Sequence, residues 1–233
     1  MSSLPVSAVL ATWLDAACAG HVRPEDLADA LRGDDPRHLV SGLPERDVLE
    51  LDELPEVVTG RVSLALPAPG DLVGLGGPAS FNVAATDAGE AVVAGDFGLV
   101  PEVDARTVVW RAYPADQVPW VDERETAAEL RLALADVTRR LVDLDVAAWQ
   151  PEIPDLLLNL RHRRPPPLPR GYDARRVETV ERAVLCLEIV ALARSEEGGA
   201  VTAYEMEHRR AALDDLERAT RRALVGACSS RSD

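Results

Sequence analysis

The residues best placed to do chemistry are the glycines of one loop in the first half of the chain. The run Gly74-Leu75-Gly76-Gly77-Pro78-Ala79 matches the string G-x-G-x-x-[G/A] and lies between a predicted strand, 61–66, and a predicted helix, 78–89. In dinucleotide-binding units such glycines let the backbone approach a pyrophosphate at a helix N-terminus, and an acid after the next strand holds the ribose. The candidate ligand-binding residues are Asp71, Gly74, Gly76, Gly77, Ser80, Asn82 and Asp96.

The surroundings of this run depart from a dinucleotide-binding unit. Residues 67–73 separate the strand from the first glycine, where the motif needs a tight turn, and the helix that follows is short. Only one further strand is visible, too few for half of a doubly wound sheet. The favoured interpretation is a structural loop with a helix starting at Pro78. A site for a nucleotide or another small ligand, in a binding protein or an enzyme, is the alternative.

A second candidate is the Pro-rich and Arg-rich connection 161–171, in a chain that is otherwise strongly acidic. Guanidinium groups bind carboxylates and phosphates through paired hydrogen bonds. The segment also contains Arg163-x-x-Pro166-x-x-Pro169, which matches ligands of SH3-type domains. The favoured interpretation is a stiff linker whose arginines pair with acids of the same molecule. The alternatives are an acidic protein partner and, third, a phosphate or nucleic-acid contact.

Three aromatic residues near the end of the third predicted strand complete the candidate partner-binding set. They either cover the junction between sheet and helices, which we favour, or form an exposed contact patch, because Trp and Tyr are enriched at interface hot spots. The full partner-binding set is Arg161, Arg163, Arg164, Arg170, Trp110, Tyr113 and Trp120.

Several kinds of catalytic site are excluded by residue type. The chain has no lysine, so Schiff-base chemistry and a Walker lysine are excluded. Glu205 and His208 form an E-x-x-H, but di-iron sites need a second copy on another helix and the chain has none. We therefore expect no metal, no cofactor and no catalytic constellation, and an enzyme is the less favoured outcome.

Charge and cysteine content bound the partners and the compartment. The net charge is −15 over 233 residues, which disfavours nucleic acid and anionic membrane surfaces. Three widely spaced cysteines suit reduced thiols. The start of the chain has no signal-peptide pattern, and Glu188 interrupts the longest apolar run. The expected location is the cytoplasm.

The element pattern predicts an α+β fold in two parts, residues 1–120 and 121–228, with a disordered tail at 229–233. The first part holds helices over 4–19, 24–32 and 46–58, a loop over 34–46, and a small sheet of about three strands at 61–66, 90–95 and 106–113. The second part is an antiparallel helical array with helices from 122, from 173 and from 202.

The first helix of the second part carries a continuous apolar stripe at spacings of three and four. Ala127, Leu130, Leu134 and Val137 belong to it, and the stripe continues to Ala148. Such a stripe needs a partner face. That face could belong to the same chain or to a second copy, so a homodimer is one of the two expected outcomes.

Several segments together resemble an uncharacterised protein family of high-GC Gram-positive bacteria. They are 64–71 (LALPAPGD), 74–82 (GLGGPASFN), 109–111 (VWR), 198–201 (GGAV) and 222–228 (RALVGAC). The resemblance covers nearly the whole chain and implies a source and compartment, but no activity. The leading hypothesis is a non-enzymatic cytoplasmic protein-interaction module.

Overall fold

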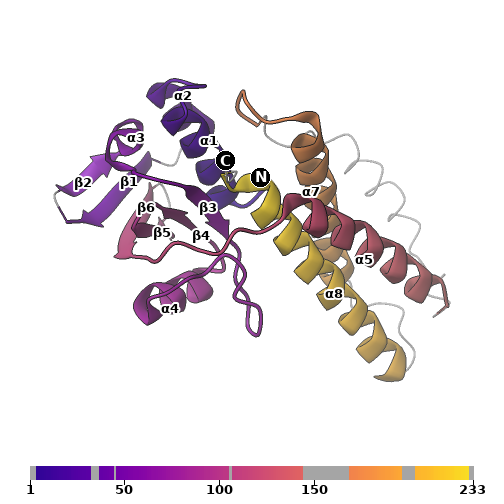
Figure 1. Ribbon diagram of the computed structural model, residues 1–233. Helices are drawn as coiled ribbons and strands as arrows, with labels where there is room; N and C mark the ends of the chain where they lie inside the picture. The colour runs from indigo at the N-terminus through magenta and orange to yellow at the C-terminus, as the bar shows by residue number, and fades with distance from the viewer. Residues whose placement is uncertain are drawn as a thin grey trace.

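The computed structural model describes residues 4–32, 37–44, 46–104, 107–143, 168–195 and 203–230. A mixed β-sheet with helices on both faces forms one part, and a layer of long helices stands at one edge of the sheet (Figure 1). The α+β class is confirmed.

The sheet has six strands in the order β2-β1-β6-β5-β4-β3. Neighbouring strands are antiparallel except β1 and β6, which run parallel. The strands are β1 (Arg37–Leu43), β2 (Arg46–Glu50), β3 (Val62–Ala65), β4 (Ala91–Ala94), β5 (Phe97–Asp104) and β6 (Thr107–Pro114). The prediction of about three strands was therefore an undercount: β3, β4 and β6 were identified, and β1, β2 and β5 were missed.

The missed strands explain two wrong assignments. Residues 34–46 were expected to be a loop, but β1 lies there, and the expected helix 46–58 is β2 followed by η1 (Leu51–Glu53) and the one-turn helix α3 (Leu54–Val57). β1 lies between Pro36 and Pro44 and contains Gly42, and it pairs in parallel with a strand about 70 residues away, Arg37 opposite Thr107. No local pattern reveals such a pairing.

The two faces of the sheet are covered by different helices. One face packs against α1 (Val6–Cys18), α2 (Pro24–Leu31) and the C-terminal part of α8 (Ala203–Cys228), and this forms the main hydrophobic core. The other face packs against α4 (Ala79–Ala88) around Phe81, in a second, smaller core. Figure 1 shows α4 on one side of the sheet and α1 and α2 on the other.

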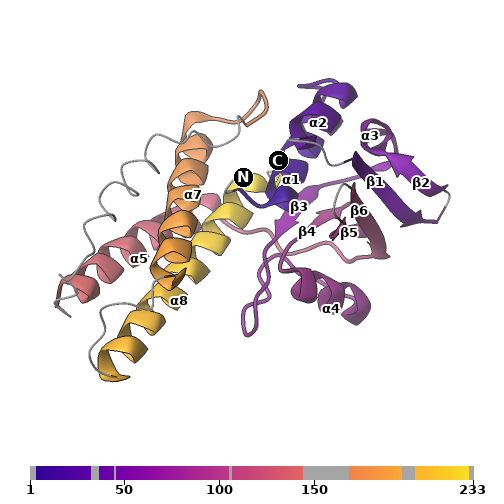
Figure 2. The ribbon, with the colours of Figure 1, turned by 180° about the vertical axis from the view of Figure 1, so that it is seen from behind.

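The long helices form a layer with α8 in its centre. α5 (Glu123–Asp143) and α7 (Ala174–Ser195) both pack against α8 and barely contact each other (Figure 2). Arg176 reaches Ala227 and Arg209 reaches Ala193, so α7 and α8 are antiparallel. The predicted stripe of α5 lies in the core shared with α8: Leu130 and Val137 are buried and Leu134 packs beside them. Within the described part, α5 thus finds its partner face in the same chain.

The end of α8 is attached to the sheet. Ser229 and Ser230, which we expected in a disordered tail, follow α8 along the outer edge of β3. Their hydroxyls accept hydrogen bonds from the Leu64 amide at 3.0 Å and the Val62 amide at 2.9 Å, and the Ser230 amide donates to the Val62 carbonyl at 2.7 Å. These bonds cover an edge that would otherwise be free to pair with another chain.

Candidate functional site

The Gly-rich loop is packed tightly against its surroundings. Gly74 has a φ of +84°, and a Cβ there would lie 2.5 Å from both Ala65 Cα and the Leu64 carbonyl oxygen. A Cβ on Gly76 would lie 2.9 Å from the Asp116 carbonyl oxygen. Both glycines thus let the loop pass close to neighbouring backbone.

The helix start that could have received a phosphate makes internal hydrogen bonds. The Gly77 amide donates to Asn82 Oδ1 at 3.1 Å, and the Gly77 carbonyl accepts from the Asp116 amide at 3.0 Å. Ser80 is exposed in the first turn of α4. The loop glycines are therefore explained by packing, and the Gly77 amide is engaged by a side chain of the same loop.

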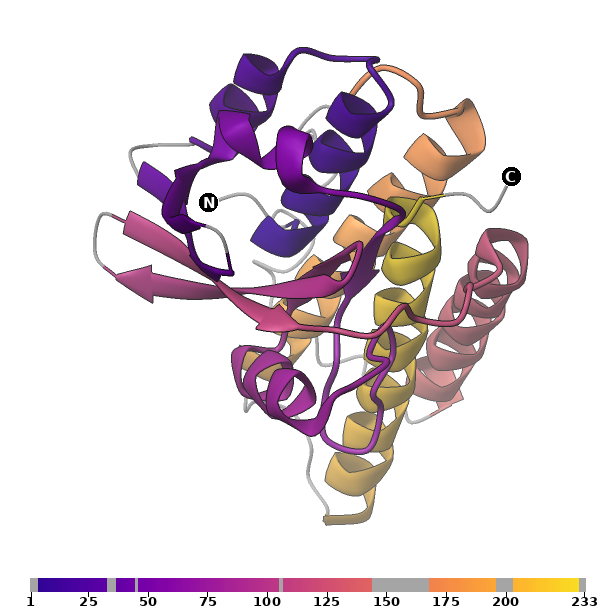
Figure 3. The ribbon, with the colours of Figure 1, turned by 60° about the vertical axis from the view of Figure 1, so that its left-hand side comes forward.

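The two acids of the predicted ligand-binding set lie in different settings. Asp71 is buried and pairs with two arginines of α8, Arg222 Nη2 at 3.2 Å and Arg221 Nη2 at 3.4 Å. This contact holds the loop beside α8 (Figure 3). Asp96 lies in the exposed turn between β4 and β5, and its carbonyl accepts a hydrogen bond from the Ala115 amide at 2.9 Å. Asp71 thus attaches the Gly-rich loop to α8, a contact that the sequence did not indicate.

The three predicted aromatic residues do not form one patch. Trp110 is fully buried in the main core, where its indole Nε1 donates to His38 Nδ1 at 3.2 Å, so it cannot bind a partner directly. Tyr113 lies three residues further along β6 and therefore on the opposite face, beside the core under α4. Trp120 alone is largely exposed, at 53%. Strand alternation separates residues that sequence proximity had grouped.

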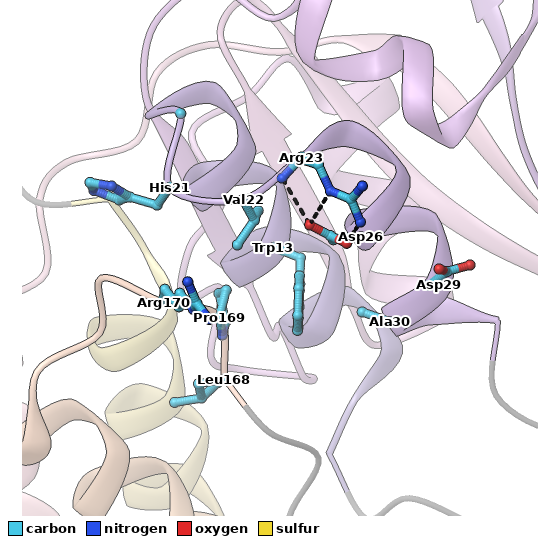
Figure 4. A pocket seen from close by; sticks show the side chains of 11 residues that line it. Trp13, His21, Val22, Arg23, Asp26, Asp29, Ala30, Leu168, Pro169 and Arg170 are labelled. Atoms are coloured by element: carbon cyan, nitrogen blue, oxygen red, sulfur yellow. Dashed lines mark hydrogen bonds and ion pairs between the residues drawn. The ribbon is translucent and has the colours of Figure 1, made fainter.

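Of the predicted arginines, Arg161, Arg163 and Arg164 lie outside the described residues. Arg170 is described and exposed, and it lines a groove of about 800 Å³ between the connection to α7 and the α1–α2 corner (Figure 4). The groove is lined by Trp13, Gly20, His21, Val22, Arg23, Asp26, Asp29, Ala30, Leu168, Pro169 and Arg170.

An apolar floor and a charged rim make up this groove. Trp13 and Leu168 pack against the main core and present their remaining surface to the groove. Figure 4 shows Trp13 between Leu168 and Pro169 on one side and the Arg23–Asp26 pair on the other. Gly171 lets the connection pass close to His21, because a Cβ at this position would lie only 2.7 Å from Cδ2 of the His21 ring.

Some of the charged groups on the rim are paired with a group of opposite charge, and one is not. Arg23 donates to Asp26 through Nη2 at 2.8 Å and through its amide at 3.0 Å, and these bonds, helped by the charge of Arg170, lower the pKa of Asp26. Asp29 pairs with Arg32 at 3.0 Å. Among the described residues, no carboxylate lies within ion-pair distance of Arg170. The guanidinium of Arg170 thus has no ion-pair partner among the described residues and lies beside the apolar floor of the groove.

The sequence indicated only the arginine of this groove. Trp13 was assigned to a helix without a role, and Arg23 and Asp26 flank a proline that was interpreted as a helix start. The groove forms because residues 168–170 pack against a corner about 150 positions earlier in the chain. No spacing along the chain could have revealed that contact.

Two further kinds of site are absent from the part of the chain that the structure describes. It holds no cluster of three or more His, Cys, Asp or Glu suited to a metal ion. None of its helices is long and apolar enough to cross a bilayer.

Comparison with known proteins places the chain in one family. The model of the N-terminal domain of Rv1486c-like proteins matches residues 7–141, and that of the C-terminal domain matches residues 124–225. The two matches overlap on α5. No curated protein and no solved structure matches the chain. Since the two matches together span nearly its whole length, the chain belongs to the family of Rv1486c-like proteins, whose domains are uncharacterised.

Proposed function

We propose that this chain is a non-enzymatic protein-interaction module of the cytoplasm, and that it binds an acidic segment of a protein partner in the groove between α1, α2 and residues 168–170. The observation that carries the proposal is the uncommitted guanidinium of Arg170 beside the apolar floor formed by Trp13 and Leu168.

The chemistry of the groove defines the segment that would fit. A guanidinium binds a carboxylate through two parallel hydrogen bonds, and a partly exposed Trp is a typical anchor for an apolar side chain. Asp26 and Asp29 are already paired with arginines, so their repulsion of a carboxylate is reduced. A segment with an acidic residue next to a bulky apolar residue would satisfy both parts of the groove.

The net charge of −15 opposes an acidic partner at long range. At physiological ionic strength that repulsion is screened over about 8 Å, whereas a direct contact with Arg170 lies inside this distance. We therefore expect affinity to depend on groove contacts and to change little with moderate added salt.

The test starts from affinity purification of the tagged full-length protein, followed by calorimetry with the stoichiometric partner identified by mass spectrometry. Arg170→Glu is expected to weaken binding at least about tenfold, since it replaces an attractive charge by a repulsive one. Trp13→Ala should have a similar effect, after circular dichroism has shown that the variant is folded.

Two exposed residues outside the groove provide matched controls. Arg131→Glu on α5 and Trp120→Ala before α5 change the same residue types and should leave binding unchanged. If the partner binds the groove variants as tightly as the unmodified protein, or loses affinity on Trp120→Ala instead, the groove is not the binding surface.

A further inference from the structure

The two edge strands of the sheet differ in what covers them. The edge of β3 is covered by Ser229 and Ser230, whereas in the described part of the chain no strand and no terminal segment pairs with the outer side of β2. Figures 1 and 2 both show β2 at the outer limit of the sheet, away from the layer of long helices. A free edge strand presents backbone amides and carbonyls that are ready to pair with another strand.

The side chains of β2 alternate between the two faces of the sheet. Leu49 is 1% exposed and faces the main core, whereas Val48 lies on the other face and is 58% exposed. Arg46 and Glu50 lie two residues before and two residues after Val48, so they share its face. One face of β2 therefore carries a cation, an exposed apolar side chain and an anion, in that order.

The two charged residues already have partners within the chain, but the pairs are exposed. Arg46 Nη1 lies 2.9 Å from Glu53 Oε1, and the Arg37 guanidinium donates to Glu50 Oε1. A guanidinium has five N–H donors and a carboxylate has about four acceptor positions. Arg46 and Glu50 can therefore each take a second partner without losing the first.

We propose that β2 pairs in the antiparallel direction with β2 of a second copy of this chain, about a two-fold axis beside Val48. In this register Val48 faces the partner's Val48, and Arg46 faces the partner's Glu50. Charges then alternate across the interface in the order Glu53, Arg46, the partner's Glu50, the partner's Arg37. Because the same surface is used by both copies, the contact closes as a dimer.

The order of charges on β2 favours a second copy over an unrelated strand. Charged side chains on an edge strand normally oppose pairing with other chains. A parallel pair of β2 strands would place Arg46 against Arg46, and an antiparallel pair centred on Asp47 would place Asp47 against Asp47, both of which are unfavourable. Only the antiparallel register centred on Val48 places Arg46 opposite Glu50, so the charges select one orientation and one register.

The dimer is expected to be weak and reversible. β2 has only 5 residues, and small interfaces are typical of transient contacts. Two copies that each carry a net charge of −15 repel one another, and on the core-facing side of β2 the two Asp47 side chains lie diagonally, about 7–8 Å apart. β2 contributes no residue to the groove beside Arg170, so the pairing is independent of partner binding there.

A cysteine at the two-fold axis tests the register directly. The background is Cys18→Ser, because Cys18 is exposed whereas Cys186 and Cys228 are buried. Directly opposed Cβ atoms lie about 4.5–5.5 Å apart, close to the separation that a disulfide needs. On mild oxidation, Val48→Cys should form a disulfide-linked dimer at least about tenfold faster than Val83→Cys on α4, where the valine is 61% exposed. Equal rates at the two positions would overturn the proposal.

Charge reversal tests the Arg46–Glu50 contact in the otherwise unmodified full chain. Arg46→Glu and Glu50→Arg should each abolish the concentration-dependent dimer in sedimentation velocity, after circular dichroism has shown that both variants are folded. An equimolar mixture of the two should form a heterodimer, because every pair across the axis is again of opposite charge.

The exposed variants Arg131→Glu and Glu56→Arg, away from β2, provide the matched control and should dimerise like the unmodified chain. If the unmodified chain is monomeric at every concentration, or if the mixture of charge-reversed variants stays monomeric, β2 does not pair with a second copy.

Discussion

Gly74 and Gly70 lie four residues apart in the Gly-rich loop and have nearly the same left-handed backbone, with φ of +84° and +81°. They differ in the space around them: a Cβ on Gly74 would lie 2.5 Å from the backbone of β3, whereas nothing lies within 4 Å of one on Gly70. Close packing therefore explains Gly74 in full.

This pair gives a test of the packing explanation. Gly70→Ala should lower the free energy of unfolding by only about 1 kcal/mol, the usual cost of an alanine in this conformation. Gly74→Ala adds overlap with backbone atoms that cannot move aside, so we expect a loss of about 2–4 kcal/mol. Urea unfolding of the two variants measures the difference. Equal losses would mean that β3 yields to the added methyl group and that Gly74 has another role.

Glu90 is a partly buried carboxyl whose charge state affects stability. The Ser7 amide, in the first turn of α1, donates to Glu90 Oε2 at 2.8 Å, and burial raises the pKa of Glu90 in spite of this bond. The folded chain therefore holds the proton more tightly than the unfolded chain. It follows that the free energy of unfolding falls as pH rises from the ordinary pKa of Glu through the raised pKa of the folded state.

Glu90→Gln should remove this pH dependence, because the amide oxygen still accepts from Ser7 and cannot ionise. Relative to the unmodified chain, the variant should gain stability as pH rises through that window and differ little below it. Urea unfolding at a series of pH values measures the effect, with the exposed Glu56→Gln on α3 as control. Parallel curves for the variant and the unmodified chain would show that Glu90 does not titrate in this window.

At the scale of elements, the sequence predicted those segments whose pattern is local. β3 and β6 alternate, β4 is a short apolar run between Gly89 and Gly95, and α1, α7 and α8 carry helical apolar spacing, so all six were located within a few residues. β5 was missed because Pro101 lies inside it, opposite Trp110 on β6. β1 and β2 became visible only through their pairing with each other and with β6.

Arg176 is the side chain that joins the elements of the helical layer. It is 4% exposed on α7, and its Nε donates to the Ala227 carbonyl at the end of α8 at 2.7 Å. Its guanidinium also donates to the Ser229 carbonyl, lies 3.8 Å from Glu123 at the start of α5, and stacks on Tyr172 at 4.3 Å from the ring centre. One cation thus satisfies the terminal carbonyls of α8, where positive charge is favoured.

Arg176→Met keeps most of the side-chain volume but removes these hydrogen bonds and the charge beside Glu123. We expect the free energy of unfolding to fall by about 3 kcal/mol, since buried carbonyls and a carboxylate lose their partner. The adjacent, exposed Arg175→Met should change it by less than about 0.5 kcal/mol. A small effect at both positions in chemical denaturation would mean that water replaces the Arg176 contacts.

At the scale of the molecule, the sequence could indicate candidate chemistry but not the surfaces that assemble it. Arg170 was identified from composition alone, while Trp13, which lies across the same groove, was not. His38 was assigned to a loop, and its pairing with Trp110 needs β1 and β6 to be neighbours. Both arrangements depend on contacts between distant segments, which residue spacing does not encode.

The two family domains meet within one continuous core, so we expect the chain to unfold as a single unit. Leu224 of α8 and Leu64 of β3 belong to the same buried cluster, and neither is accessible to solvent.

Leu224→Ala should lower the free energy of unfolding by about 2–5 kcal/mol. Because the core is shared, it should lower the denaturation midpoint equally for helical circular dichroism and for the fluorescence of Trp13 and Trp110, which report on the sheet and on the helix packed against it once Trp120 and Trp149, the other two tryptophans, are replaced by phenylalanine. Leu132→Ala, on the exposed face of α5, should shift neither. Two separate transitions, with only the helical signal moved by Leu224→Ala, would mean that the helical layer folds on its own and only rests against the edge of the sheet.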